Sequence, residues 1–321
     1  MWKFIARRLL LTLPQIIILS VIVFALAQAM PGDALTGMID PNISPEAVLA
    51  QRQALGLDNP WYVQYWNWVT GAVRGDFGRS FRSQSPVTTV IGERLSLTLG
   101  LSALTLVLTY LIAVPLGIIA GRYRETWKDR IITSYTFFAL AMPSFTMGLV
   151  MLFVFGFSLQ WFPTRGSVDV MAAAQGGLSE FVSRLYHMFL PALSLALIST
   201  TAIIQYLRSG IIDLESREFI VTARAKGADE RRVYNRHIFR NSLLPVASFL
   251  GFQIAFLIGG SIFVEYIFSY PGMGELMISS IITRDFTVMT ALILMFGLAS
   301  IFGALLSDII LTIVDPRIRI K

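Results

Sequence analysis

The stretch that decides the fold is residues 96–120, "SLTLGLSALTLVLTYLIAVPLGIIA", which contains no Asp, Glu, Lys or Arg. A helix needs about 20 predominantly apolar residues to cross the hydrocarbon core of a bilayer. A run of this length and composition therefore predicts a transmembrane helix. Five further runs of the same character occur in the chain, at about 9–30, 131–157, 187–207, 245–268 and 288–313. The sequence predicts an all-α integral membrane protein with six transmembrane helices.

The composition of the whole chain agrees with this fold class. The 321 residues are 55% hydrophobic and only 14% charged, with a mean hydropathy of +0.66, whereas a soluble domain carries about 25% charged residues. The chain has no cysteine, which excludes disulfides and thiolate metal sites. The two histidines, His187 and His237, are far apart in sequence and form no HExxH motif. We therefore expect no metal site.

The first apolar run resembles a signal peptide but is interpreted as a retained helix. It is too long for the apolar part of a signal peptide, and no convincing small-x-small cleavage site follows it. We expect this helix and the long segment after it to form one unit, residues 1–94. The other unit, residues 95–321, would hold the remaining five helices.

The distribution of basic residues predicts the orientation in the membrane, because Lys and Arg are retained on the cytoplasmic side. With the N-terminus inside, the cytoplasmic segments hold 18 of the 26 Lys and Arg residues and the outer segments hold 8. Both termini are then cytoplasmic. The formal charge of +6 reflects this orientation, and we expect no binding to nucleic acid.

The outer segment 31–94 contains two predicted helices. The first covers about 44–56, and the second opens at Pro60. Trp61, Tyr65 and Trp68 in the second share one helical face. Aromatic rings with a polar tip favour the membrane–water interface, so this helix could lie on the outer membrane surface. The same face could instead dock an external partner.

Two acidic residues stand inside or close to predicted spans. Glu265 lies near the outer end of the fifth span, and Asp308 lies about 10 Å deep in the sixth, counted from Asp315 at 1.5 Å per residue. A charge inside the membrane is a candidate functional group. The alternative is that both carboxylates face the bundle interior and pair locally. Four prolines within or beside spans are candidate kinks: Pro14, Pro115, Pro143 and Pro191.

No catalytic constellation is recognisable in the chain. It contains neither the GxxxxGK[ST] phosphate-binding loop nor the GxSxG nucleophile motif. We therefore assign no catalytic and no cofactor-binding residue. If the protein does energised work, the energy must come from another chain.

The segment 218–245, "EFIVTARAKGADERRVYNRHIFRNSLLP", is a basic interruption between two of the most apolar parts of the chain. A helix is predicted from about Asp213 to Lys226. Gly227 follows at the left-handed position where many helices end. Asp229 is a candidate cap for a second helix, on which Arg232, Arg236 and Arg240 are spaced by four residues.

Ala223 and Gly227 are four residues apart, so we expect them on one face of the first helix. Small residues let a backbone approach another surface closely. Binding to anionic lipid would explain the arginines, but it favours bulky apolar anchors, which this turn lacks. Docking against a protein is the preferred interpretation.

These residues resemble a known family. "TARAKGADERRV" followed by "HIFRNSLLP" is similar to the cytoplasmic loop, called the EAA motif, of ABC importer permeases. Val221 and Thr222 stand where that motif has Glu and its first Ala, and this departure resembles the dipeptide/oligopeptide/nickel branch. Other similar stretches are "RRLLLTLP", "LGLDNPWYVQYWNWVTGAVRGDFGRSF", "VEYIFSYPGMG" and "DPRIRI". The resemblance covers nearly the whole chain and is to the first of the two paired permease subunits.

The resemblance implies a type I importer permease in the bacterial cytoplasmic membrane, with a cytoplasmic coupling loop at about 208–244. Two different permease subunits would pair, and two ATPase subunits would bind ATP and Mg, so this chain would need no cofactor of its own. A binding protein outside would deliver the substrate. The residues expected to couple to the ATPase are Glu218, Thr222, Ala223, Arg224, Lys226, Gly227 and Asp229.

The expected function is import of short peptides. Nickel or glutathione import by the same machinery remains an alternative within the family. A passive channel or a membrane enzyme is the alternative from a different class. A channel needs no docking helix for an ATPase, and an enzyme needs catalytic motifs that the chain lacks.

The predicted topology can be tested by single-cysteine labelling, because the chain has no native cysteine. We expect a membrane-impermeant reagent to label Asn59→Cys and Gly176→Cys in intact cells. Lys128→Cys, Asp229→Cys and Lys321→Cys should react only after the membrane is opened. Labelling of position 229 from outside would contradict this orientation.

Overall fold

The structure is a computed structural model that describes residues 2–29, 53, 56 and 58–314. The predicted helix at 44–56 and the C-terminal "DPRIRI" therefore lie outside the described residues, apart from single positions. The described part of the chain is helical and contains no strand. Its helices are α1 (Trp2–Ala29), α3 (Trp61–Val73), α4 (Val87–Arg122), α5 (Trp127–Ala141), α6 (Ser144–Met151), α7 (Val170–Gln175), α8 (Gly177–Glu215), α9 (Glu218–Ala225), α10 (Glu230–Arg232), α11 (Arg240–Gly260), α12 (Ile262–Ile267), α13 (Met273–Ile282) and α14 (Phe286–Val314), with two π-helical turns, η1 (Leu152–Ser158) and η2 (Val233–Phe239).

Four of the described helices are long and apolar enough to cross a membrane, and they correspond to four of the six predicted runs. They are α1 from Ala6 onward, α4, α8 and α14. A bent pair of helices adds a fifth span if the pair is counted as one. The remaining predicted run, 245–268, is occupied by α11 and α12, with a break between them at Ser261.

The predicted span at 131–157 is not a single helix but a bent pair of helices. α5 ends at Ala141, and the chain resumes as α6 and η1 after a bend of 107°. The cause is Pro143, which disfavours helical geometry at the residue before it. Met142 accordingly is extended, with φ −91° and ψ 121°. Pro14, Pro115 and Pro191 lie inside continuous helices instead.

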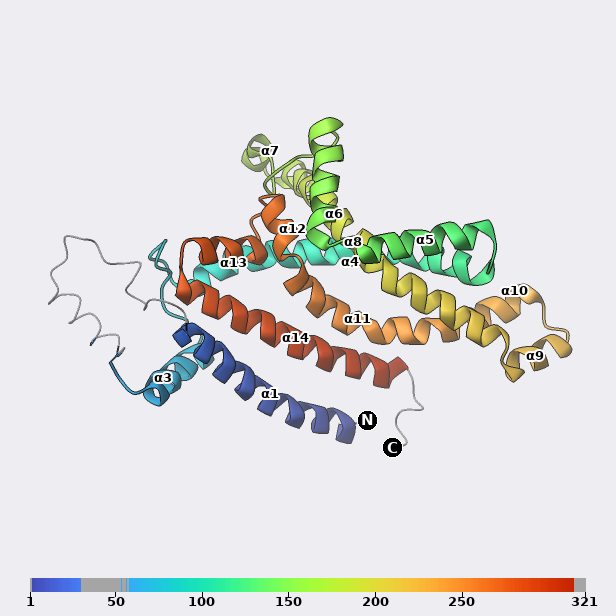
Figure 1. Ribbon diagram of the computed structural model, residues 1–321, viewed down its shortest axis with the longest axis horizontal. Helices are drawn as coiled ribbons and strands as arrows, with labels where there is room; N and C mark the ends of the chain where they lie inside the picture. The colour runs from blue at the N-terminus through green and yellow to red at the C-terminus, as the bar shows by residue number, and fades with distance from the viewer. Residues whose placement is uncertain (1, 30–52, 54–55, 57, 315–321) are drawn as a thin grey trace.

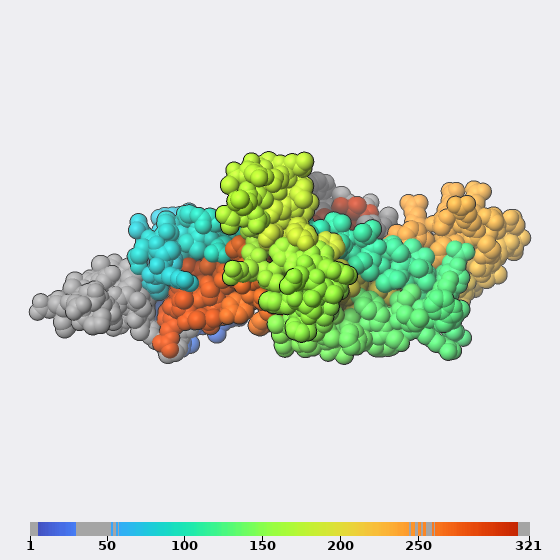
Figure 2. Space-filling view, turned by 90° about the horizontal axis from the view of Figure 1, so that it is seen from above, coloured from blue at the N-terminus to red at the C-terminus, as the bar shows by residue number. Residues whose placement is uncertain are grey.

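The long helices lie side by side in an elongated bundle (Figure 1). α3 and α13 lie at one end, and α9 and α10 lie at the other. α6 and α7 project sideways from the bundle. Figure 2 shows the elongated molecule from above, with the light-orange segment that contains α10 at one end and the cyan outer segment toward the other.

The outer helix α3 begins one residue later than predicted, because Pro60 is its N-cap. Its aromatic face packs partly on α1. The ring centres of Tyr65 and Phe24 are 5.5 Å apart, and those of Trp68 and Phe24 are 5.9 Å apart. The Tyr65 hydroxyl is also 2.8 Å from Ser20 Oγ. This face is therefore partly used within the chain, whereas Tyr62 and Trp66 are exposed.

α4 and α8 form the most extensive helix pair of the bundle. Their close approach depends on two glycines of α4. A Cβ placed on Gly117 would lie 2.8 Å from Leu207 Cβ, and one on Gly121 would lie 2.8 Å from Ile211 Cβ. Contacts of this length are below van der Waals distance, so any side chain at these positions would force the helices apart.

The glycine contact predicts that Gly117→Ala destabilises the bundle, because overpacking a filled interface costs about 1–3 kcal/mol. The matched control is Gly92→Ala on the same helix, where nothing lies within 4 Å of the added Cβ. Ala is the better helix former by roughly 1 kcal/mol, so this control should not destabilise. Denaturant unfolding of the purified protein in detergent measures both. Equal stability of the two variants would contradict the packing argument.

Candidate functional site

The segment that follows α8, predicted to be cytoplasmic, is the candidate site. The helix predicted from Asp213 to Lys226 is in fact two helices, because α8 ends at Glu215 and α9 begins at Glu218. Arg217, between them, is extended, with φ −75° and ψ 141°. The Ser216 hydroxyl donates to the Asp213 carbonyl at 3.1 Å. A side chain that satisfies a terminal carbonyl in this way favours a helix end at this point.

α9 is held to the rest of the chain by one fully buried side chain, Ile220. It packs in a cluster with Ile211 of α8 and with Val233 and Ile238 of η2. The rest of the helix surface is solvent-exposed and includes two large apolar residues, Phe219 and Val221, which flank Ile220 on either side and are 46% and 57% exposed. α9 therefore has an inner face that is fixed to this chain. We call its remaining, solvent-exposed surface the outer face of α9.

Ala223 does not lie on the outer face, contrary to our expectation. It is partly buried and packs against the inner cluster. Gly227 lies beyond the end of α9, so the two residues do not share a helical face. The four-residue spacing was misleading because the helix ends before the second residue is reached.

The left-handed conformation predicted for Gly227 is confirmed, with φ +77°. The Gly227 N–H donates to the Arg224 carbonyl at 2.9 Å, and the Ala228 N–H donates to the Ala223 carbonyl at 3.2 Å. These two bonds form a Schellman motif, which closes the C-terminus of a helix when Gly adopts positive φ. The turn after α9 thus has a defined geometry.

Asp229 occupies the N-cap position of α10, as predicted, but its side chain makes no capping hydrogen bond. α10 is only three residues long and continues as the π-helical turn η2. The four-residue spacing of Arg232, Arg236 and Arg240 therefore does not follow a regular α-helix, although all three side chains are exposed.

Arg224 has a partner that the sequence did not indicate. Its Nε donates to Glu230 Oε1 at 2.7 Å and its Nη2 donates to Oε2 at 3.2 Å, across the Gly227 turn. This hydrogen-bonded ion pair lowers the pKa of Glu230 and raises the pKa of Arg224. Both side chains are exposed, so solvent screens the pair. It joins α9 to α10 without burying charge.

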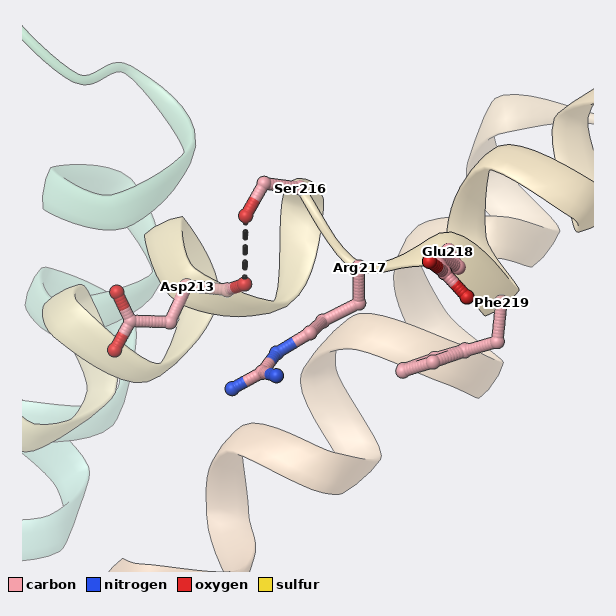
Figure 3. A pocket seen from close by; sticks show the side chains of 5 residues that line it. All are labelled: Asp213, Ser216, Arg217, Glu218 and Phe219. Carbon is pink, nitrogen blue, oxygen red and sulfur yellow. Dashed lines mark hydrogen bonds between the residues drawn. The ribbon is translucent and has the colours of Figure 1, made fainter.

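An open pocket of about 630 Å³ lies where α9 begins (Figure 3). Its lining combines charged groups with one aromatic ring: Asp213, Ser216, Arg217, Glu218 and Phe219. Glu218 is one of the expected coupling residues, whereas Arg217 and Phe219 were missed. They line the pocket because the break between α8 and α9, which the sequence did not indicate, brings the end of one helix beside the start of the next.

The other expected coupling residues lie on the surface of the same segment. Thr222, Arg224, Lys226, Gly227 and Asp229 are all exposed. The structure therefore brings the expected set together on one short segment, with Ala223 as the member that faces inward.

Glu265 is enclosed at the outer end of the bundle and is fully buried. Its carboxylate accepts hydrogen bonds from Thr98 Oγ1 at 2.9 Å, Ser261 Oγ at 2.8 Å and the Gly274 backbone N–H at 2.6 Å. A Cβ on Gly272 would clash with Glu265 Oε2. The glycines of "VEYIFSYPGMG" thus let the turn before α13 fold over this carboxylate. Local pairing is confirmed here.

Asp308 also pairs locally. Its Oδ2 is 2.9 Å from Arg8 Nη1, so the ion pair joins α14 to α1. Both acids therefore have hydrogen-bonding or ion-pair partners within this chain.

A buried carboxylate of α5, Asp129, was missed by the sequence reasoning. It binds Arg208 through two short hydrogen bonds. Both residues lie near helix ends that we predicted to be cytoplasmic, where charges are expected for orientation alone. Nothing in the spacing of 129 and 208 indicates that they meet.

The comparison with known families accounts for almost the whole chain. Residues 1–102 match the N-terminal part of the membrane component of binding-protein-dependent transport systems. Residues 113–320 match the family described as "Binding-protein-dependent transport system inner membrane component". The chain belongs to this family. It is a multi-pass permease of the bacterial cytoplasmic membrane, of the type found in ABC importers.

Individual relatives match this permease over its full length. It is 38% identical to the oligopeptide transport system permease protein AppB of Bacillus subtilis, over 99% of this chain and 100% of the relative. It is 34% identical to the glutathione transport system permease protein GsiC of Escherichia coli strain K12, over 100% of both chains.

The fold has been seen in a solved transporter. A chain of the inward-facing MetNI methionine ABC transporter superposes with a TM-score of 0.56 at 14% sequence identity. The match covers 70% of this permease and 96% of that chain. At this identity the likeness shows the fold alone, and it confirms the predicted type I permease architecture.

Proposed function

We propose that this permease is the membrane-spanning subunit of an ATP-driven importer of short peptides. The observation that carries the proposal is the full-length match to a permease named for oligopeptides. The second relative is named for glutathione, which is itself a tripeptide. Both relatives thus act on peptide-like substrates.

The outer face of α9 is the proposed docking site for an ATPase subunit. Phe219 and Val221 are large apolar side chains exposed on the two flanks of this anchored helix. Burying a side chain of this kind is worth roughly 1.5–3 kcal/mol. The pocket beside Phe219 supplies charged groups at the rim of the same face. A hydrophobic centre with a polar rim is the usual composition of a protein interface.

The other subunits of the proposed transport complex are separate chains. ATP and Mg would bind to two ATPase subunits, because this chain has no phosphate-binding loop. A second permease subunit would complete the pathway, and a binding protein would deliver the peptide from outside. Closure of the ATPases would then move α9. Since Ile220 fixes α9 to Ile211 at the end of α8, that movement would reach the membrane part of the chain.

A passive channel is the competing function from another class. A channel has no use for a helix that is anchored on one face and apolar on the other in the cytoplasm. Membership of a binding-protein-dependent transport family also favours the importer.

The docking face can be tested with α9 variants in the assembled complex. We expect Phe219→Ala and Val221→Ala to leave the protein inserted but to weaken ATPase retention. Truncating a central interface residue costs about 2 kcal/mol or more, and each 1.4 kcal/mol corresponds to about tenfold in affinity. Pull-down of the ATPase subunits and stimulated ATP hydrolysis measure the effect.

Two further variants define the expected pattern. Arg232→Ala, exposed on the same segment, should have a milder effect. Ala223→Leu should disturb the inner cluster and lower the stability of the permease itself, because Ala223 packs against that cluster. Retention of the ATPase at the wild-type level in both the Phe219 and Val221 variants would rule out α9 as the docking element.

The substrate class is tested by transport into proteoliposomes that contain the complete complex and its binding protein. We expect uptake of labelled dipeptides and oligopeptides, driven by ATP. Glutathione and Ni²⁺ are the competing substrates in the same assay. Uptake of Ni²⁺ without any uptake of peptide would overturn the assignment, and uptake of glutathione alone would narrow it to that tripeptide.

A further inference from the structure

An ion pair joins α5 to α8 near the cytoplasmic end of the bundle. Arg208 Nε donates to Asp129 Oδ1 at 2.7 Å, and Arg208 Nη2 donates to Asp129 Oδ2 at 2.8 Å. Two parallel bonds between a guanidinium and a carboxylate fix both the distance and the relative orientation of the two groups. The side chain of Asp129 is only 5% exposed, and that of Arg208 is 31% exposed. This is a partly buried, geometrically defined joint.

The same carboxylate also holds the turn between α4 and α5. The backbone N–H of Glu125 donates to Asp129 Oδ2 at 2.9 Å. Thr133 Oγ1 donates to Asp129 Oδ1 at 3.0 Å. Glu125 has a positive φ of 63°, a conformation that a non-glycine residue keeps only when its surroundings hold it. Both carboxylate oxygens are thus occupied by groups of this chain, and the site is an internal joint.

Arg208 stands close to the point where α8 meets the segment made of α9, α10 and η2, which we call the coupling segment. Ile211, about one turn further along α8, packs with Ile220 of α9. A second contact runs beside it, because the Arg122 guanidinium at the end of α4 lies 5.1 Å from the centre of the Tyr234 ring in η2. The coupling segment therefore contacts both α8 and the end of α4, immediately beside the Asp129–Arg208 joint.

α5 leads from this joint to the bend at Pro143, where the chain turns by 107° into α6. A second hydrogen bond ties α5 to α8 further from the joint, from the Tyr135 hydroxyl to the Leu197 carbonyl at 2.7 Å. A helix is stiff over this length. A displacement imposed at its cytoplasmic end therefore reaches the bend.

We propose that Asp129 and Arg208 are positioning residues of the transport cycle. Their ion pair makes the bent span α5–α6 follow the end of α8 when the coupling segment moves. The proposal rests on the proposed function, in which an ATPase moves α9. It assigns the transmission of that movement within the membrane to a specific pair of side chains.

The test uses the double variant Asp129→Asn with Arg208→Gln. Removing one member alone would leave an uncompensated, partly buried charge and would endanger folding. The double variant removes both charges and keeps two amides that hydrogen-bond to each other. The matched control is Glu180→Gln with Arg184→Gln, an ion pair of 2.6 Å on the outer part of the same helix α8.

The complete complex is reconstituted in proteoliposomes, and ATPase retention, ATP hydrolysis and peptide uptake are measured on the same preparation. We expect the double variant to retain its ATPase subunits and to hydrolyse ATP close to the wild-type rate. Uptake should fall, so that the number of ATP molecules hydrolysed per peptide imported rises about tenfold. A change of this size lies within the range by which single substitutions alter the coupling between distant sites. The control should behave as wild type. Arg208→Lys keeps the charge but loses the two parallel bonds, and we expect an intermediate ratio.

Two outcomes would overturn the proposal. One is a wild-type ratio of ATP to peptide in the double variant. The other is loss of the ATPase subunits from that variant, because the pair would then only support the docking segment. Failure of the proposed function itself is recognised separately, since it would show in the Phe219 and Val221 variants, which do not touch this joint.

Discussion

Gly117 and Gly121 allow α4 and α8 to pack at a distance that no other residue would permit. Residues of these two helices also hold other parts of the bundle in place. α4 provides Thr98 for the buried Glu265 at the outer end, and α8 provides Arg208 for Asp129 at the inner end. α8 also continues, after a short break, into the coupling segment. Because the hydrophobic effect does not drive helices together within lipid, such close contacts between small residues are the main source of association.

Two buried acids of the bundle lie where the chain changes direction, and a third acid joins two helices along their length. Glu265 holds the turn before α13, Asp129 holds the turn between α4 and α5, and Asp308 ties α14 to α1. A carboxylate in the membrane is costly unless it is paired, and each of these is paired. The irregular backbone at the turns also needs hydrogen-bond donors and acceptors that lipid cannot provide. Glu265 and Asp129 thus meet a structural demand at the points where regular helix is interrupted.

The sequence was informative about what depends on local composition and uninformative about what depends on contacts. Apolar length predicted the helices, and Gly227 predicted the left-handed turn after α9. The break at Ser216 was missed because the acidic and basic residues around it suit one continuous helix as well as two. The inward position of Ala223 and the pairing of Asp129 with Arg208 follow from how α8 packs, which spacing along the chain cannot show. Pro143 was noted as a possible kink, but its bend of 107° depends on how the neighbouring helices receive α6.

The inner face of α9 has a consequence for how this helix could be exchanged between related transporters. Ile220 is fully buried among residues from α8 and η2, so the eight residues of α9 are not a portable module. A chimaera that receives only a foreign α9 would keep the new contact surface but lose the fit beneath it. Divergence of the exposed side, in contrast, is free of this restriction. New specificity for an ATPase partner could therefore arise on Phe219 and Val221 while the buried anchor stays unchanged.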